Sequence, residues 1–278
     1  MTKQMAEKAE YTEKERMAGK MKFSERKQGL VTEKFKVGYG KKVILSNVNL
    51  MAEPGRVLTL IGPNGSGKST ILKSIVKQLK SLGGVVYLNG KATSEMKEAE
   101  IAKSLSMVMT EHIHPELMSC RDVVATGRYP YTGRLGILDK QDWKLVDEAI
   151  TKVHAEEVAE QSFTRISDGQ RQRVMLARAI CQDTAILVLD EPTSYLDIRY
   201  KLDILNSIRK LARERNIAVI MSLHELDLVQ KVSDMVACVD GTTVSHIGPP
   251  EEIFQGSLVQ KLYGIEEKNF DSMLGIMQ

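Results

Sequence analysis

Residues 62–70 read GPNGSGKST, in which glycines, a lysine and hydroxyl side chains have the spacing of a phosphate-binding loop. The run follows the apolar segment 57–61 and precedes apolar residues at helical spacing, so we expect a strand, a tight turn and a helix. Glycine lets backbone N–H groups turn toward an anion, and a helix start adds partial positive charge there. Lys68 can reach the β- and γ-phosphates of a nucleotide, and the Ser69 hydroxyl can ligate Mg²⁺. A chance glycine-rich turn is the alternative, and the complete motif in this context argues against it.

Two acids follow the apolar run 185–189, where a buried strand would end. Asp190 can hold Mg²⁺ directly or through water, and Glu191 can polarise an attacking water molecule. In an open α/β sheet, ligands gather beyond the carboxyl ends of the strands, where the phosphate-binding loop also lies. We therefore expect these acids to face that loop rather than only to cap the next turn.

The composition is that of an ordinary globular protein, with 42% apolar and 27% charged residues in a chain of 278. No apolar run approaches the length of a membrane span, and the N-terminus lacks the apolar core of a signal peptide, so a cytoplasmic location is expected. Cys120, Cys181 and Cys238 are far apart and odd in number, which favours reduced thiols over a disulfide framework or a zinc site.

The positive charge is concentrated at the N-terminus. Residues 1–28 contain eight Lys or Arg and five Glu, which gives +3; the whole chain also has +3, so residues 29–278 sum to zero. The mixed signs favour a disordered or locally helical extension over a segment that binds anionic lipid or nucleic acid. We expect residues 29–278 to form the folded domain, and we expect no nucleic-acid partner.

The remaining pattern predicts an α/β fold with a mainly parallel sheet and helices on both faces. Short strands are expected within residues 30–50, and the helix after the phosphate-binding loop is expected to end at Gly83-Gly84. Residues from about 95 to 165 have apolar positions at helical spacing and predict a mostly helical insertion, in which Asp139 and Asp142 resemble a capping pair. Further expected elements are strands at 85–88, 185–189 and 217–221, a helix at 171–181, and edge strands at 235–239 and 243–247.

Residues 166–173, ISDGQRQR, resemble the LSGGQ signature of ATP-binding cassette (ABC) ATPases. Residues 192–197, PTSYLD, are similar to the segment that follows the second acid in that family. His224 matches its switch histidine, and Tyr39 lies where the family places an aromatic side chain against adenine. The resemblance runs from about residue 30 to 265 with the motifs in order. It implies a P-loop NTPase core with an antiparallel β subdomain and an inserted helical subdomain.

The resemblance also implies ATP as substrate, Mg²⁺ as cofactor and a homodimer as the working form. A Ser-x-Gly turn at a helix start is an anion site, and in this family it closes over the γ-phosphate held by the other subunit. Glu191, His224 and Lys68 would then act in hydrolysis, and Asp197 would lie across the dimer interface. The residues expected to contact nucleotide are Tyr39, Gly62, Asn64, Gly65, Ser66, Gly67, Lys68, Ser69, Thr70, Ser167, Gly169, Gln170 and Asp197. The expected metal ligands are Ser69, Asp190 and Thr110.

Two positions depart from the family pattern. Asp168 replaces the usual glycine of the signature, and an acid near phosphate can tune its affinity. The family carries glutamine after the strand that ends near Met109, whereas this chain has Thr110 and Glu111, either of which could take its place. His112 and His114 follow directly. Two histidines two residues apart on a loop, with no acid at a fixed spacing, do not favour a metal site.

Residues 121–134 resemble a stretch of the ATPases that drive importers of ferric siderophores, haem and cobalamin. This resemblance implies a motor at the cytoplasmic face of the membrane, bound to two transmembrane permease subunits and indirectly to a substrate-binding protein. A soluble ABC ATPase of iron–sulfur cluster assembly, with soluble scaffold partners, is the alternative. Three further classes do not match the sequence. A DNA-repair ATPase would need a long coiled-coil insertion, and a translation factor would need two cassettes, but this chain has neither. A non-enzymatic scaffold would lack the second acid, whereas Glu191 is present.

Overall fold

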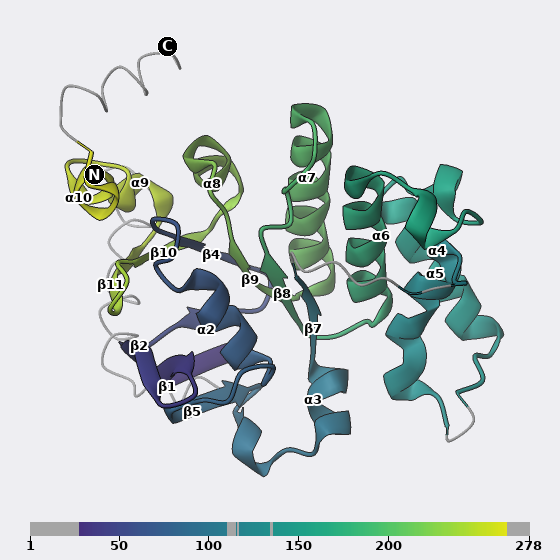
Figure 1. Ribbon diagram of the computed structural model, residues 1–278, viewed down its shortest axis with the longest axis horizontal. Coiled ribbons are helices and arrows are strands. Elements are labelled where there is room, and N and C mark those ends of the chain that lie inside the picture. Colours follow the sequence, from purple (N-terminus) through teal and green to yellow (C-terminus); the bar gives the residue numbers. More distant parts are fainter. Residues whose placement is uncertain (1–27, 110–114, 116, 134–135, 266–278) are drawn as a thin grey trace, which may run out of the picture.

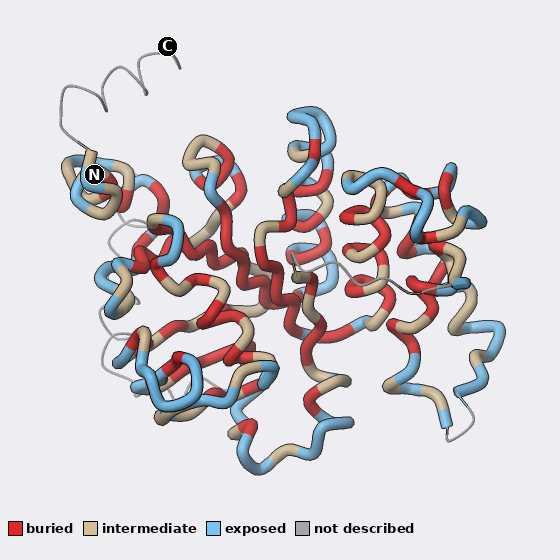
Figure 2. The backbone as a smooth tube through the Cα atoms, in the orientation of Figure 1, coloured by how far each residue is buried: buried red, intermediate tan, exposed pale blue. Residues whose placement is uncertain are grey.

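A six-stranded sheet, in the order β11-β10-β4-β9-β8-β7, lies at the centre of the computed structural model, which describes residues 28–109, 115, 117–133 and 136–265 (Figure 1). Neighbouring strands run parallel, except that β11 pairs antiparallel with β10. All residues of β4, β8 and β9 are buried, as expected for parallel strands covered on both faces (Figure 2). The strands are β4 (Val57–Ile61), β7 (Leu105–Val108), β8 (Ile186–Asp190), β9 (Ala218–Ser222), β10 (Met235–Val239) and β11 (Val244–Gly248).

The expectation that Met235–Val239 is an edge strand is wrong. This strand, β10, lies between β4 and β11 and forms backbone pairs with both. Four of its five residues are buried, and a continuous apolar run suits an interior strand better than an edge.

A second, antiparallel sheet has the order β2-β1-β5-β6, and β3 also pairs with β1. Its strands are β1 (Leu30–Tyr39), β2 (Lys42–Val48), β3 (Met51–Ala52), β5 (Gly83–Leu88) and β6 (Lys91–Ala92). Helix α2 (Lys68–Ile75) lies between the two sheets (Figure 1). Its buried Ile71 and Leu72 share one apolar cluster with Leu58 and Leu60 of β4.

Alternate residues of β4 face the opposite layer. Val57 and Ile61 belong to a second cluster with the helices α4 (Cys120–Ala125), α5 (Lys140–Lys152), α6 (Asp168–Cys181), α7 (Ile198–Arg215) and α8 (Leu226–Val232). The central sheet is therefore packed on both faces, which fixes the positions of the loops at its strand ends. The short helices α9 (Pro250–Ile253) and α10 (Leu258–Tyr263) follow β11.

Helix α2 is shorter than expected. It ends at Ile75 with Val76 as its C-cap, and Lys77 has a positive φ of 62° and donates from Nζ to the Thr93 backbone oxygen at 2.7 Å. Gly83 and Gly84 instead belong to β5, where a Cβ on Gly84 would lie 2.4 Å from the Lys34 backbone oxygen. These glycines allow close strand pairing and do not end the helix.

The region expected to be mostly helical contains α3 (Glu98–Ser104), α4, α5 and short 3-10 turns, and it also contributes β7 to the parallel sheet. Asp139 caps α5 and forms a capping box with Asp142, which confirms the expected capping pair. The buried Arg128 donates to Asp142 Oδ1 at 2.9 Å and to the Cys181 backbone oxygen at 2.9 Å, so it joins α5 to the end of α6.

Cys120, Cys181 and Cys238 are free and buried, as the sequence predicts. Burial raises the pKa of Cys120 and Cys238 to about 11 and that of Cys181 to about 12, so all three remain thiols at neutral pH. In the part of the chain that the structure describes, no helix has the length and apolar character needed to cross a bilayer.

Candidate nucleotide-binding site

The glycine-rich loop joins β4 to α2, and its backbone requires glycine at two positions. Gly62 has a φ of 151°, and a Cβ there would lie 2.1 Å from the Val239 backbone oxygen. Gly67 has a φ of 98° and is the N-cap of α2, where a Cβ would lie 2.2 Å from Leu45 Cδ1. Asn64 and Gly65 form the exposed tip of the loop. The loop is therefore compact, and the start of α2 opens onto it.

Lys68 begins α2 and is almost fully buried, with 5% of its surface exposed. Its Nζ donates to the backbone oxygens of Gly62 at 2.7 Å and Pro63 at 3.0 Å, so the loop itself positions the ammonium group. Burial lowers the pKa of Lys68, while the carboxylates of Glu191 and Asp190 act against that effect. A buried cation close to a helix start provides a site for phosphate oxygens.

Asp190 is fully buried at the end of β8 and accepts two hydrogen bonds at Oδ1. Ser69 Oγ donates to it at 2.9 Å and Ser222 Oγ at 2.8 Å. The second oxygen, Oδ2, is buried and has no hydrogen-bond partner among the residues that the structure describes. An unpartnered carboxylate oxygen beside a serine hydroxyl fits Mg²⁺, which takes one or two protein ligands and completes its shell with water and phosphate oxygens. No cluster of three His, Cys, Asp or Glu side chains suited to a metal occurs among the described residues.

Glu191 lies next to this aspartate in a left-handed backbone conformation, with a φ of 51°. Its Oε1 is 2.5 Å from His224 Nε2, and its Oε2 accepts from Ser194 Oγ at 3.1 Å. The Glu191 backbone N–H donates to Ser222 Oγ at 3.0 Å, and the same hydroxyl donates to Asp190. A strained, non-glycine conformation held by several contacts is typical of a functional position.

Tyr39 ends β1 close to the loop. Its hydroxyl lies 3.3 Å from Thr70 Oγ1 in α2, and 53% of the residue surface is exposed. An exposed ring beside the phosphate-binding helix is available to stack on a flat ligand group.

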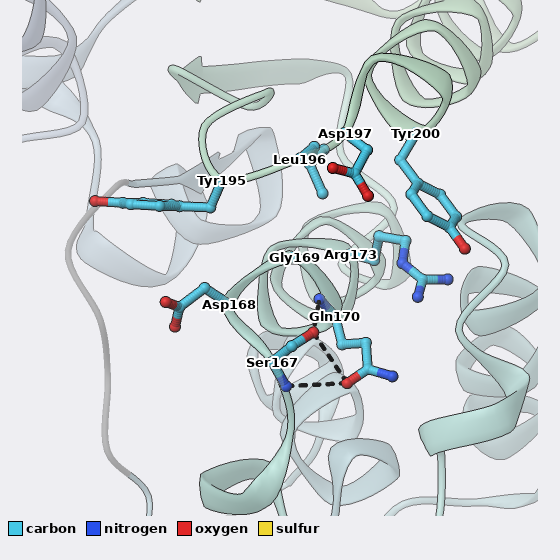
Figure 3. A pocket seen from close by; sticks show the side chains of 9 residues that line it. All are labelled: Ser167, Asp168, Gly169, Gln170, Arg173, Tyr195, Leu196, Asp197 and Tyr200. Carbon is cyan, nitrogen blue, oxygen red and sulfur yellow. Dashed lines mark hydrogen bonds between the residues drawn. The ribbon is translucent and has the colours of Figure 1, made fainter.

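The signature residues form a separate group at the start of α6 (Figure 3). Ser167 is the N-cap, and its Oγ accepts from the Gln170 backbone N–H at 3.3 Å while its own N–H donates to Gln170 Oε1 at 2.9 Å. Asp168 forms an ion pair with Arg171 in the first turn. Gly169 is tightly placed, because a Cβ there would lie 3.3 Å from both Leu196 Cδ2 and the Tyr195 backbone oxygen.

A cavity of about 450 Å³ lies between this turn and the start of α7. Arg173 and Tyr200 form part of its wall, and the guanidinium lies 4.9 Å from the centre of the tyrosine ring (Figure 3). Asp197, the N-cap of α7, is exposed on the opposite wall from Ser167. The lining residues are Ser167, Asp168, Gly169, Gln170, Arg173, Tyr195, Leu196, Asp197 and Tyr200.

The structure thus divides the expected site residues into two groups. Lys68, Ser69, Asp190, Glu191 and His224 meet at the carboxyl ends of β4, β8 and β9. The Ser167 turn and Asp197 instead line the cavity between the starts of α6 and α7. Thr110, Glu111, His112 and His114 lie outside the described residues.

Sequence reasoning missed two contributors. Ser222 bridges Asp190 and Glu191, and its only sequence signal is a small polar residue at the end of an apolar strand. The Tyr263 hydroxyl accepts a hydrogen bond from the Gly62 backbone N–H at 3.0 Å, across 201 residues of sequence. No local pattern marks a contact of that range.

A glycine-rich loop before a helix, next to a buried acid at the end of a parallel strand, defines a P-loop nucleotide-hydrolysing fold. Residues 45–194 match the family model described as ABC transporter. An uncharacterised ABC transporter ATP-binding protein of Methanocaldococcus jannaschii is 41% identical over 90% of this chain and 86% of its own length. The iron(3+)-hydroxamate import ATP-binding protein FhuC of Bacillus subtilis is 36% identical over 85% of this chain and 88% of its own length.

Among solved structures, a dimeric ATP-binding cassette in a post-hydrolysis state with ADP and Pi superposes with a TM-score of 0.71. It covers 80% of this chain and 98% of its own, and at 24% identity it supports the fold alone. The chain belongs to the ABC transporter ATP-binding family. It is an ATP-binding and ATP-hydrolysing enzyme with the fold of ABC ATPases.

Proposed function

We propose that this chain is the ATP-hydrolysing subunit of an importer for iron–siderophore complexes or similar metal chelates. The supporting observation is its similarity to the hydroxamate-import ATPase, which extends over 88% of that protein's length and not only over the nucleotide motifs. Two copies of the chain would act beneath two membrane-spanning permease subunits, at the cytoplasmic face. A substrate-binding protein would deliver the chelate to those permeases.

The separation of the two residue groups supports a homodimer. The phosphate loop of one copy would receive the triphosphate, and the Ser167 turn of the second copy would close over the γ-phosphate. This turn has an exposed helix start and an adjoining cavity, and a helix N-terminus attracts phosphate. Gly169, Gln170 and Asp197 would lie on the same contact surface. Residues 29–278 would form the ATPase domain, with about 95–165 as its helical part.

The remaining roles follow from position. Tyr39 would stack on adenine, and the loop residues Gly62, Asn64, Gly65, Ser66, Gly67, Lys68 and Thr70 would surround the phosphates. Ser69 and Asp190 would hold Mg²⁺, which would neutralise charge on the phosphate oxygens. Thr110 stays a candidate metal ligand from the sequence alone.

Hydrolysis would depend on Glu191 and His224. Glu191 would accept a proton from the attacking water while the water oxygen forms a bond to the γ-phosphorus and the bond to the bridging oxygen breaks, which yields ADP and Pi. His224, 2.5 Å from that carboxylate, would hold it in place and contact the γ-phosphate. The Ser194 hydrogen bond to Oε2 limits rotation of the same carboxylate.

The Glu191→Gln variant tests the catalytic and dimer proposals together. We expect it to bind Mg-ATP, to lose turnover by about 100-fold or more, and to elute as a dimer only with ATP. Wild-type turnover would contradict the catalytic role, and a variant that stays monomeric with saturating Mg-ATP would contradict the dimer.

Purification of the tagged chain from detergent-solubilised membranes of its native cell tests the transport proposal. Mass spectrometry should identify a polytopic membrane protein at roughly one permease subunit per ATPase subunit. Soluble iron–sulfur scaffold proteins in its place would support the alternative assignment.

A further inference from the structure

The residue directly after His224 is held by a different helix from its own. Glu225 is the N-cap of α8, yet its side chain makes no capping hydrogen bond. Its Oε1 instead accepts from Lys201 Nζ of α7 at 2.5 Å, and its Oε2 accepts from Thr193 Oγ1 at 3.4 Å. The loop that carries His224 is therefore tied to α7 and to the segment after Glu191.

Lys201 lies in an unfavourable place for a cation. It belongs to the first turn of α7, which contains no acid, so the partial positive charge at the helix start opposes its ammonium group. The Lys201 side chain is only 22% exposed. The Glu225 carboxylate supplies a compensating negative charge from outside the helix.

The Glu225 carboxylate is ionised at neutral pH. Burial acts to raise its pKa, but hydrogen bonds from Lys201, the backbone and Thr193, together with the charge of Lys201, outweigh burial and lower the pKa. The contact is therefore a true ion pair under working conditions.

The same end of α7 borders the cavity beside Ser167. Leu196, Asp197 and Tyr200 line that cavity, and the Lys201 backbone N–H donates to the Asp197 oxygen at 2.9 Å. Any group that fills the cavity and moves the start of α7 must move Lys201, because the two share one helical turn. Through Glu225 that movement reaches the backbone next to His224.

We propose that Lys201 and Glu225 are positioning residues for hydrolysis: their ion pair couples the cavity at the Ser167 turn to the placement of His224 against Glu191. The proposal rests on the roles given to Glu191 and His224 above. Neither Lys201 nor Glu225 touches the reacting groups, so their effect is on the rate of the chemical step and not on nucleotide affinity.

Steady-state and single-turnover hydrolysis by the full chain test this coupling. Lys201→Gln and Glu225→Gln are each expected to lower kcat about five- to tenfold and to leave the KM for ATP within about twofold of wild type. The exchanged pair, Lys201→Glu with Glu225→Lys, should recover most of the lost rate, and Lys201→Arg should retain it. The matched control is Lys210→Gln on the same helix, because its ion pair with Glu214 is exposed and far from the site.

A purely structural ion pair would give another result: lower melting temperatures with unchanged kcat in the folded variants. That outcome, or failure of the exchanged pair to regain activity while it folds, overturns the proposal. Lys201→Arg and Lys201→Gln keep the test valid if Glu225→Gln does not fold. Glu191→Gln is measured in parallel. If Glu191→Gln loses turnover while Lys201→Gln has no effect, the coupling proposal is rejected and the catalytic role of Glu191 stands. Wild-type turnover of Glu191→Gln would reject the catalytic assignment and the coupling with it.

Discussion

The phosphate loop and the Ser167 turn are both glycine-containing helix starts, but they are built in opposite ways. At the phosphate loop, Lys68 is buried and held by backbone oxygens, and Ser69 is bonded to Asp190 from a distant strand. At the Ser167 turn the side-chain contacts are local: Ser167 bonds to Gln170 and Asp168 pairs with Arg171. One site is preorganised by the fold of its own chain, whereas the other is a small exposed turn beside an open cavity. This contrast is what the proposed homodimer requires, because a site completed by a second copy has to keep one half accessible.

The largest effect is expected from Lys68→Ala, which removes the buried cation from the preorganised half. ATP affinity should fall by about 100-fold or more, because a buried charge that faces phosphate is worth several kcal/mol, roughly 2–5. Calorimetric titration with Mg-ATP measures this. Lys210→Ala, an exposed lysine on α7, serves as the control and should bind normally. Near-normal affinity of Lys68→Ala would show that the loop backbone alone holds the phosphates.

Ser167→Arg should separate the two halves. The arginine blocks the exposed turn but not the phosphate loop, so each copy should still bind ATP while turnover falls by about 100-fold. Nucleotide titration measures ATP affinity, and a phosphate-release assay measures turnover. Ser245→Arg on the exposed face of β11 is a control for added charge and bulk. Equal loss of binding and turnover would mean that the two groups are not functionally separate.

The titration of Lys68 gives the preorganised half a pH signature. Burial lowers its pKa in the free protein, and phosphate should raise it again in the complex. ATP affinity should therefore be constant below the free-state pKa and fall above it, by roughly tenfold per pH unit at most, because binding then requires proton uptake. Calorimetry in buffers of different ionisation enthalpy measures the uptake. An ATP affinity that stays constant into the alkaline range would contradict proton uptake by Lys68 on binding.

Tyr263→Phe probes the contact that reaches the loop from the last described helix. Loss of one hydroxyl removes the acceptor for the Gly62 N–H, so the KM for ATP should rise about two- to tenfold with little change in kcat. Tyr131→Phe is a suitable control, because that hydroxyl bonds to the Asp183 oxygen away from the nucleotide site. Identical KM values for the two variants would show that Tyr263 only fills space.

Asp168→Asn should give the smallest effect, and it acts on the accessible half. The acid favours the start of α6 while no phosphate is present, and it opposes an incoming phosphate. Its removal should strengthen ATP-dependent dimerisation by about two- to fivefold at low salt, and by less at high salt. Sedimentation of the chain in the Glu191→Gln background measures the dimerisation constant at low and at high salt. Weaker dimers at low salt would mean that the ion pair with Arg171 shapes the turn.

Local sequence patterns predicted the parts of this fold that depend on local physics. The buried strands β4, β8 and β9 appear as short, mainly apolar runs because both of their faces are covered. The capping pair at Asp139 and Asp142 has the spacing of a capping box at a helix start. The phosphate loop combines both signals, so its position between β4 and α2 was readable from the chain alone.

The errors arose where distant residues decide the structure. The sequence does not show which strands are neighbours, so the expectation of an edge strand at β10 misses that β4 and β11 flank it. Helix α2 ends early because Lys77 adopts a positive φ and reaches Thr93, while Gly84 serves pairing with β1. Ser222 and Tyr263 carry no local signal, since their importance comes from Asp190 and Gly62 on other elements.

The place of β4 in its sheet has a consequence for synthesis on the ribosome. Its partners β9 and β10 are translated long after it, and the Val57 N–H bonds to an Asp234 side chain 177 residues later. Strand β4, which leads into the nucleotide loop, therefore cannot pair with these neighbours until the last strands leave the exit tunnel, whereas α2 packs on the earlier strands β1 and β2. An apolar strand without neighbours is a binding target for chaperones throughout this interval, so the preorganised half of the site depends on strands that are synthesised last.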